Sequence, residues 1–181
     1  MRSTGDELLS AIDADPDDDA ARRVYADWLL DQGDSRGELI HLQLAPVHDE
    51  PRIRTLIEQH RDALLGSFSA IARAFEIRRG FVAAVTIDAS DVARADRVAV
   101  ARLEELDVTG VVEADLLELL TVFQPRRELT LHIPYGAAVQ AKHTRSGEPW
   151  DVLLTGVFEM QGFNIDNTLS AHPAIVGYVN R

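Results

Sequence analysis

Apolar residues in the first part of the chain recur at helical intervals. The segment Thr4–Glu7 has the spacing of a helix capping box, and Leu8, Leu9 and Ile12 follow it at the intervals of one helix face. This pattern predicts a first helix that ends before Pro16.

A second helix is predicted from the aspartates at 17–19 to about Gln32. Carboxylates at a helix start accept hydrogen bonds from backbone N–H groups that have no partner within the helix, and Gly33 suits the helix end. The apolar positions of this helix form one broad face, on which Trp28 is expected to belong to the core.

Two more helices are predicted before residue 70. Ser35–Glu38 repeats the capping-box spacing ahead of a third helix that closes before Pro46, and Pro51 suits the start of a fourth that reaches Leu64 and Leu65. Residues 1–70 are therefore predicted to form a helical module.

The apolar period changes after residue 70. Residues 81–87 are rich in β-branched side chains and follow the turn-like pair Arg79-Gly80, which predicts a strand paired with residues 74–77.

Three segments share an apolar-x-x-apolar-x-apolar frame. The first two segments begin at Val82 and Leu103, and the third has Arg126 in place of an apolar residue at its first position, so the starts lie 21 and 23 residues apart. Leucine-rich repeats have periods of about 20–29 residues, with helices between strands, here expected at 91–101 and 113–123. The asparagine usual in such repeats is absent from all three segments, so a generic α/β layer with parallel strands stays open.

Residues 134–181 differ from the rest. Strands are predicted at 151–160 and 175–179, separated by a polar run at 161–170. The predicted fold class is α/β, with α+β as the alternative. It comprises the helical module (1–70) packed on leucine-rich-repeat-like units (71–133), with a β-containing C-terminal cap or extension (134–181).

Residues 8–44 resemble a bacterial repeat-companion domain, a short module found ahead of leucine-rich repeats. Three motifs carry the resemblance: Asp15-Pro16-Asp17, Tyr25-Ala26-Asp27-Trp28-Leu29 and Gly33-Asp34-Ser35-Arg36-Gly37-Glu38. Arg79-Gly80-Phe81-Val82 is similar to the entry into the repeats of such proteins. The resemblance implies a helical cap on a repeat array and no assigned catalytic activity; it does not extend to residues 134–181.

Charge narrows the class of partner. The net charge is -12, and residues 1–50 hold 13 acidic and 4 basic side chains, which gives -9 for that segment. Nucleic-acid binding is not expected, because it usually needs a clustered basic face. The absence of cysteine and of any apolar run of roughly 18 residues favours a cytoplasmic protein that neither enters nor anchors in a membrane.

No catalytic, cofactor or metal motif stands out. The alternation Asp13, Asp15, Asp17 has the first spacings of a calcium loop, but Asp18 and Val24 occupy the positions of its glycine and its last glutamate. The six histidines show no metal-ligand spacing, and neither a nucleophile elbow nor a phosphate-binding loop is present. The sequence therefore favours a protein that is not an enzyme.

Two regions are candidate partner-binding sites. Thr86, Asp107 and Thr130 share one outward position of the repeated frame, and His132 follows on the last strand. The run Lys142–Asp151 is predicted to be an exposed loop that could contribute further contacts. Its candidate binding residues are His143, Arg145 and Trp150.

The leading functional hypothesis is a non-catalytic module that binds a protein partner through the strand face. One alternative is an acidic regulatory or inhibitory protein that docks on a basic partner. Another is a small-ligand protein or enzyme with a pocket near His132 and His143. Self-association is also open, because an exposed repeat end often needs covering.

Overall fold

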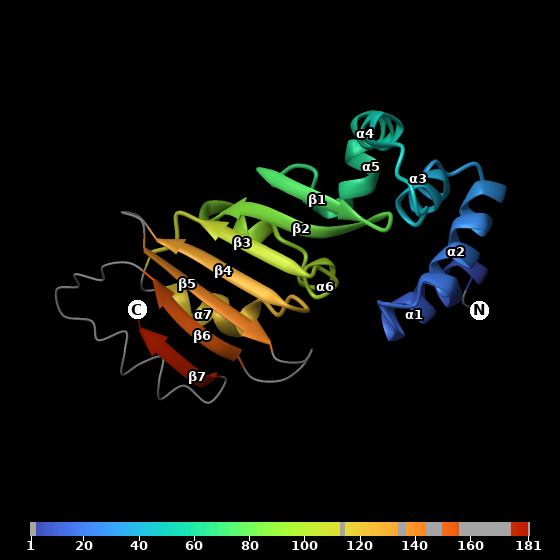
Figure 1. Ribbon diagram of the computed structural model, residues 1–181. Coiled ribbons are helices and arrows are strands. Elements are labelled where there is room, and N and C mark those ends of the chain that lie inside the picture. Colours follow the sequence, from blue (N-terminus) through green and yellow to red (C-terminus); the bar gives the residue numbers. More distant parts are fainter. Residues whose placement is uncertain (1–2, 113–114, 134–136, 144–149, 156–174, 181) are drawn as a thin grey trace. The chain divides into compact units, whose positions relative to one another are not determined.

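The computed structural model describes residues 3–112, 115–133, 137–143, 150–155 and 175–180. The protein has an α/β fold, and its contacts divide it into two compact units (Figure 1). The helical unit comprises Met1–Ser69 and Ile77–Val82, and the sheet unit comprises Ala70–Glu76 and Ala83–Arg181.

The helical unit contains the helices that the first 70 residues predict. They are α1 (Thr4–Ala14), α2 (Asp19–Asp31), α3 (Arg36–Gln43), α4 (Glu50–Gln59) and α5 (Arg61–Leu65), followed by the 3-10 turn η1 (Gly66–Phe68). The predicted fourth helix is thus two helices, which meet at His60.

Helix caps confirm part of the sequence interpretation. The first capping box is shifted by one residue, because Ser3 and not Thr4 is the N-cap, and it pairs reciprocally with Asp6. The carboxylate of Asp18 accepts hydrogen bonds at the start of α2. Gly33, with φ at +75°, ends that helix as predicted.

The capping box predicted at Ser35 is wrong. The Ser35 side chain makes no cap hydrogen bond, and Asp34 accepts the backbone N–H of Arg36 instead, at 2.8 Å. The Glu38 carboxylate is engaged elsewhere, since it receives two hydrogen bonds from Arg52 at 2.6 and 2.8 Å.

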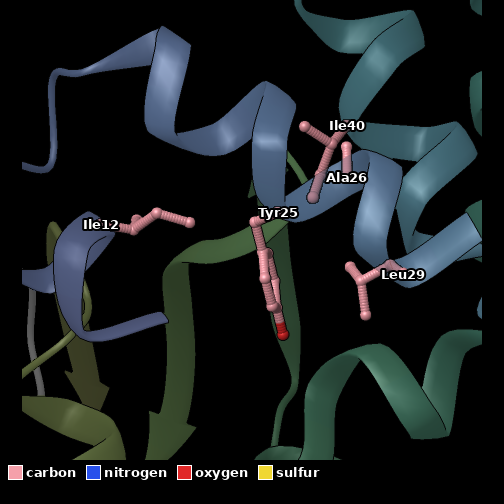
Figure 2. Close-up of a cluster of buried hydrophobic side chains, with 5 residues drawn as sticks. All are labelled: Ile12, Tyr25, Ala26, Leu29 and Ile40. Atoms are coloured by element: carbon pink, nitrogen blue, oxygen red, sulfur yellow. The ribbon is translucent and has the colours of Figure 1, made fainter. Parts of the chain in front are cut away.

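The core of the helical unit lies where α1, α2 and α3 meet. Its fully buried members are Ile12, Tyr25, Ala26, Leu29 and Ile40 (Figure 2). Trp28 is only partly buried and packs against this cluster, so it borders the core and is not one of its buried members as was expected.

The tip of the hairpin formed by β1 (Ala74–Arg78) and β2 (Phe81–Asp88) belongs to the helical unit. Its turn needs left-handed backbone at Arg79 and Gly80, with φ at +51° and +81°. The Gln43 side chain fixes this turn: its Nε2 donates to the carbonyl of Ile77 at 2.9 Å, and its Oε1 accepts from the N–H of Gly80 at 2.7 Å.

Side chains of the hairpin tip complete the helical core. Phe81 stacks on Tyr25 with 6.0 Å between ring centroids, and the guanidinium groups of Arg22 and Arg36 lie 5.8 and 5.9 Å from the Phe81 centroid. Residues that lie far apart in the sequence therefore form one packed unit.

The described strands form a single seven-stranded mixed sheet in the order β1-β2-β3-β4-β5-β6-β7. The strands that follow the hairpin are β3 (Glu105–Thr109), β4 (Glu128–Ile133), β5 (Ala137–His143), β6 (Trp150–Thr155) and β7 (Ile175–Asn180). Pairing is parallel from β2 to β4, antiparallel for β4–β5 and β5–β6, and parallel for β6–β7. The sequence interpretation missed β5.

Short helical segments connect the parallel strands. They are the 3-10 helix η2 (Ala89–Arg94), α6 (Arg97–Val100) and α7 (Leu116–Val122). The helix predicted at 91–101 is thus split in two, because the Asp96 side chain caps α6 and starts a new helix there. Among the described residues, no helix is long and apolar enough to cross a membrane.

The repeated frame appears as register across β2, β3 and β4. Val85 lies opposite Leu106, which lies opposite Leu129, and the next apolar row is Ile87, Val108 and Leu131. All six side chains are buried. The shared frame therefore places equivalent residues side by side and gives the sheet one apolar face.

We predict that Gly80→Ala destabilises the helical unit much more than Gly33→Ala. Both glycines have positive φ, so both substitutions cost about 1 kcal/mol for the left-handed backbone. A Cβ at Gly80 would clash with Ile40 Cγ1, whereas a Cβ at Gly33 meets nothing within 4 Å. Overpacking should add about 1–3 kcal/mol at Gly80 alone, measured by urea unfolding. Equal losses would contradict this packing.

Candidate functional site: the polar face of the sheet

Residues that alternate with the apolar rows form a polar face on the sheet unit. The register places Thr86 opposite Asp107 and Asp107 opposite Thr130, and β5 extends the row with Gln140. All four side chains are half-buried. Three of these residues are the predicted strand-face positions, and their role in binding stays a prediction.

A second row of this face is charged. It crosses the sheet from Ala84 through Glu105, Glu128 and Lys142 to Asp151. Lys142 Nζ lies 3.0 Å from Glu128 Oε2. The other carboxylate oxygen of Glu128 accepts hydrogen bonds from Thr130 and Gln140, which links the two rows.

The outer end of the polar face holds His132 and Asp88. The His132 side chain is exposed. Asp88 accepts hydrogen bonds from the Ser90 hydroxyl at 2.6 Å and from the Ser90 N–H at 3.0 Å, and these hydrogen bonds lower the pKa of Asp88. Asp88 therefore acts as a cap for the segment after β2, whereas His132 is accessible to a partner.

Asp107 lies in an electrostatically unfavourable environment on this face. Burial raises the pKa of Asp107 above its ordinary value, and the negative charges of Glu128 and Glu105 raise it further. His132 and a hydrogen bond from Thr130 act in the opposite direction. The carboxylate is thus only partly compensated by its own neighbours.

The two ends of the second predicted region, Lys142–Asp151, belong to strands and not to a loop. Lys142 and His143 belong to β5, while Trp150 and Asp151 begin β6. The expectation that these residues lie in an exposed loop is therefore wrong, because the strands of the β5–β6 hairpin extend further than the turn residues suggested.

His143 and Trp150 are direct partners in the register of that hairpin, at the level of the backbone. Arg145 and the rest of residues 144–149 lie outside the described residues.

The structure does not bring His132 and His143 together. In the antiparallel β4–β5 pair, His132 lies opposite Ala138, five positions along β5 from His143. At about 3.4 Å per residue, this separates the two backbone positions by roughly 17 Å. The geometry therefore gives no support to a pocket that uses both histidines as acid–base groups.

Sequence reasoning missed Glu105, Glu128 and Gln140 as members of this face. The period of two was a usable signal for the glutamates, since each lies two positions before a residue that was identified, Asp107 or Thr130. Gln140 could not be placed without β5, whose alanines and lysine are poor strand formers.

In comparisons with known proteins, no family model matches the chain, and neither a curated protein nor a solved structure is significantly similar to it. Within the described part of the chain, no three histidine or carboxylate side chains are placed to hold a metal ion. The function is therefore inferred from the geometry of the polar face.

We predict that Asp107→Asn stabilises the protein at neutral pH. Because the pKa of Asp107 is higher in the folded state than in the unfolded state, folding takes up a proton at pH values between the two. Stability therefore falls as pH rises through that window, and asparagine, which has no charge, avoids the loss. The gain should be present at pH 7 and vanish below the ordinary aspartate value of 3.8.

The gain in the free energy of unfolding is measured by urea unfolding at pH 7 and at a pH below 3.8. The control is Asp31→Asn on an exposed position of α2, which should show no comparable pH-dependent gain. If Asp107→Asn is destabilising at pH 7, the carboxylate is better compensated than the geometry indicates.

Proposed function

We propose that this protein is a non-catalytic interaction module that binds a protein partner through the polar face of its sheet unit. The observation that carries the proposal is the in-register row Thr86, Asp107, Thr130 and Gln140 across four neighbouring strands. In arrays of strand-and-helix units, the strand side is the extended surface that contacts partners.

The chemistry of the face supports recognition through hydrogen bonds. Threonine hydroxyls and the Gln140 amide can both donate and accept, and the carboxylates accept. The apolar side chains that alternate with this row on β2, β3 and β4 are buried, so these three strands present mainly polar side chains on this face. Partner binding would therefore depend on polar contacts and on charge.

The size of the face also constrains the partner. The rows cross four or five strands about 4.8 Å apart, which span roughly 14–19 Å, and the polar positions span roughly 13 Å along the strands. The resulting patch of about 200 Å² is much smaller than the roughly 800 Å² that each partner buries in a stable protein complex. A short segment of a partner fits this area better than a broad globular surface.

The resemblance of residues 8–44 to a repeat-companion domain agrees with this proposal, because such a module would cap a repeat array that presents a strand face.

The rival hypothesis of an acidic helical half that docks on a basic partner is less well supported. Several of its aspartates already have structural roles: Asp18 caps α2, Asp34 caps α3, and Asp17 lies 3.1 Å from the Arg79 guanidinium. These carboxylates contribute less to a free acidic surface than the composition suggests.

The test is an affinity capture from the lysate of the native host with two variants. The face variant is Thr86→Arg, Asp107→Arg, Thr130→Arg, which adds four positive charges by replacing two neutral residues and one acid. The control is Asp31→Arg, Glu58→Arg, which adds the same four charges at exposed positions of α2 and α4. We expect a stoichiometric partner that is retained by the wild type and the control and lost by the face variant.

Circular dichroism establishes that each variant is folded. A partner that the folded face variant retains would overturn the strand-face proposal. Loss from both variants would instead indicate attraction to the overall negative charge of the chain.

A further inference from the structure

We propose that the hairpin tip (Ile77–Val82) is a strap that opens together with α1, α2 and α3 while the rest of the sheet stays paired. Ion pairs of Arg79 make this opening sensitive to salt. The inference concerns a conformational change of the helical unit and does not depend on the proposed binding function. All the contacts that hold the tip on the helices lie within the helical unit.

The first argument is the point at which the parallel pairing of β2 begins. β2 pairs with β3 from Ala84 to Asp88, and the carbonyl of Ala83 accepts the N–H of Glu104 at 2.8 Å. The part of β2 that belongs to the tip, residues 81 and 82, precedes this pairing. The tip can therefore leave the helices while β2 keeps its pairing with β3.

The second argument is that the tip completes the core of the helices. Tyr25 of α2 is only 7% exposed, and Phe81 stacks on its ring. Gln43, at the end of α3, hydrogen-bonds both to the carbonyl of Ile77 and to the N–H of Gly80. Loss of the tip removes these contacts from two helices at once, so we expect the helices and the tip to open as one cooperative unit.

The third argument is the position of Arg79. Its guanidinium donates to the carbonyl of Pro16 at 3.3 Å, in the loop between α1 and α2. The same group lies 3.1 Å from the Asp17 carboxylate and 3.5 Å from that of Asp19. The Asp17 side chain is 73% exposed, so dissolved salt screens its attraction to Arg79.

The backbone of Arg79 makes these ion pairs more important. Arg79 is left-handed, with φ at +51°, a conformation that glycine and asparagine adopt at lower cost. The ion pairs therefore stabilise a turn that the arginine backbone alone disfavours. Arg79→Asn removes the ion pairs and keeps a residue that suits the turn, so we expect this variant to fold.

The experiment measures hydrogen exchange of backbone amides in the full-length chain by NMR. The N–H of Gly80 reports on the tip, the amides in the middle of α2 report on the helices, and the N–H of Glu104 reports on the sheet. The protection of each amide is compared between the wild type and Arg79→Asn at roughly 50 and roughly 500 mM sodium chloride. Taking this ratio at each salt concentration cancels the general effect of salt on an acidic chain.

We expect the ratio of wild-type to Arg79→Asn protection to fall with salt, by about two- to fivefold, at Gly80 and in α2. At Glu104 the ratio should stay constant. The control is Arg94→Asn, which removes the same charge from an ion pair of the sheet unit, Arg94 with Asp91 at 2.7 Å. With Arg94→Asn in place of Arg79→Asn, the ratio at Gly80 should not depend on salt.

A second pair of variants tests whether the tip and the helices open together. Gln43→Met removes both hydrogen bonds to the turn and keeps the length of the side chain. Protection at Gly80 and in α2 should fall together by at least about tenfold, with Glu104 unchanged. Gln59→Met, at the exposed end of α4, is the control and should change none of the three by more than about twofold.

Three results would overturn the inference. If Gln43→Met lowers protection at Gly80 but not in α2, the tip opens by itself. If Glu104 loses protection by the same factor as Gly80, the sheet opens along with the helices and the tip is not a separate strap. If the ratio of wild-type to Arg79→Asn protection is the same at both salt concentrations, the ion pairs of Arg79 do not control the opening.

Discussion

The parallel, in-register pairing of β2, β3 and β4 is the constraint on which the sheet unit depends. A shift by one residue would move Leu106 and Leu129 from the core to the opposite face and bring Asp107 and Thr130 inside. The cost of burying those polar groups and exposing the leucines is what fixes the register. The same constraint that builds the core therefore also builds the polar face, and the two cannot be changed independently.

Sequence reasoning reached the parts of this fold that depend on local periodicity. Val85, Leu106 and Leu129 lie together in the sheet and occupy the same position of the repeated frame. The frame is visible in the sequence because its copies begin 21 and 23 residues apart. Strand β5 was missed because alanine, glutamine and lysine alternate there without β-branched residues apart from Val139, and the strand forms by pairing with β4 and β6. The antiparallel pairing of β5 then decides that Gln140 joins the row, which no local signal indicates.

Contacts between distant segments set the limit of sequence reasoning in the helical unit. The turn at Arg79 and Gly80 was expected from local chemistry, but its attachment to the helices was not. Gln43 bonds to both ends of that turn, and Phe81 fills the space beside Tyr25. A glutamine and a phenylalanine at these positions have many possible roles in a sequence, and only the packed structure shows that the hairpin tip completes a core built by residues before 70.

The side chains on the two faces of the sheet have different effects on the stability of the fold. On the apolar face, complete burial of the six frame residues stabilises the fold at each position. On the polar face, burial and the nearby carboxylates of Glu128 and Glu105 raise the pKa of Asp107, which lowers stability at neutral pH. Stability alone would favour neutral side chains there, since a threonine or glutamine would occupy the same space without repulsion. A half-buried charge in an otherwise consistent sheet is the feature of the polar face that the proposed binding function would account for.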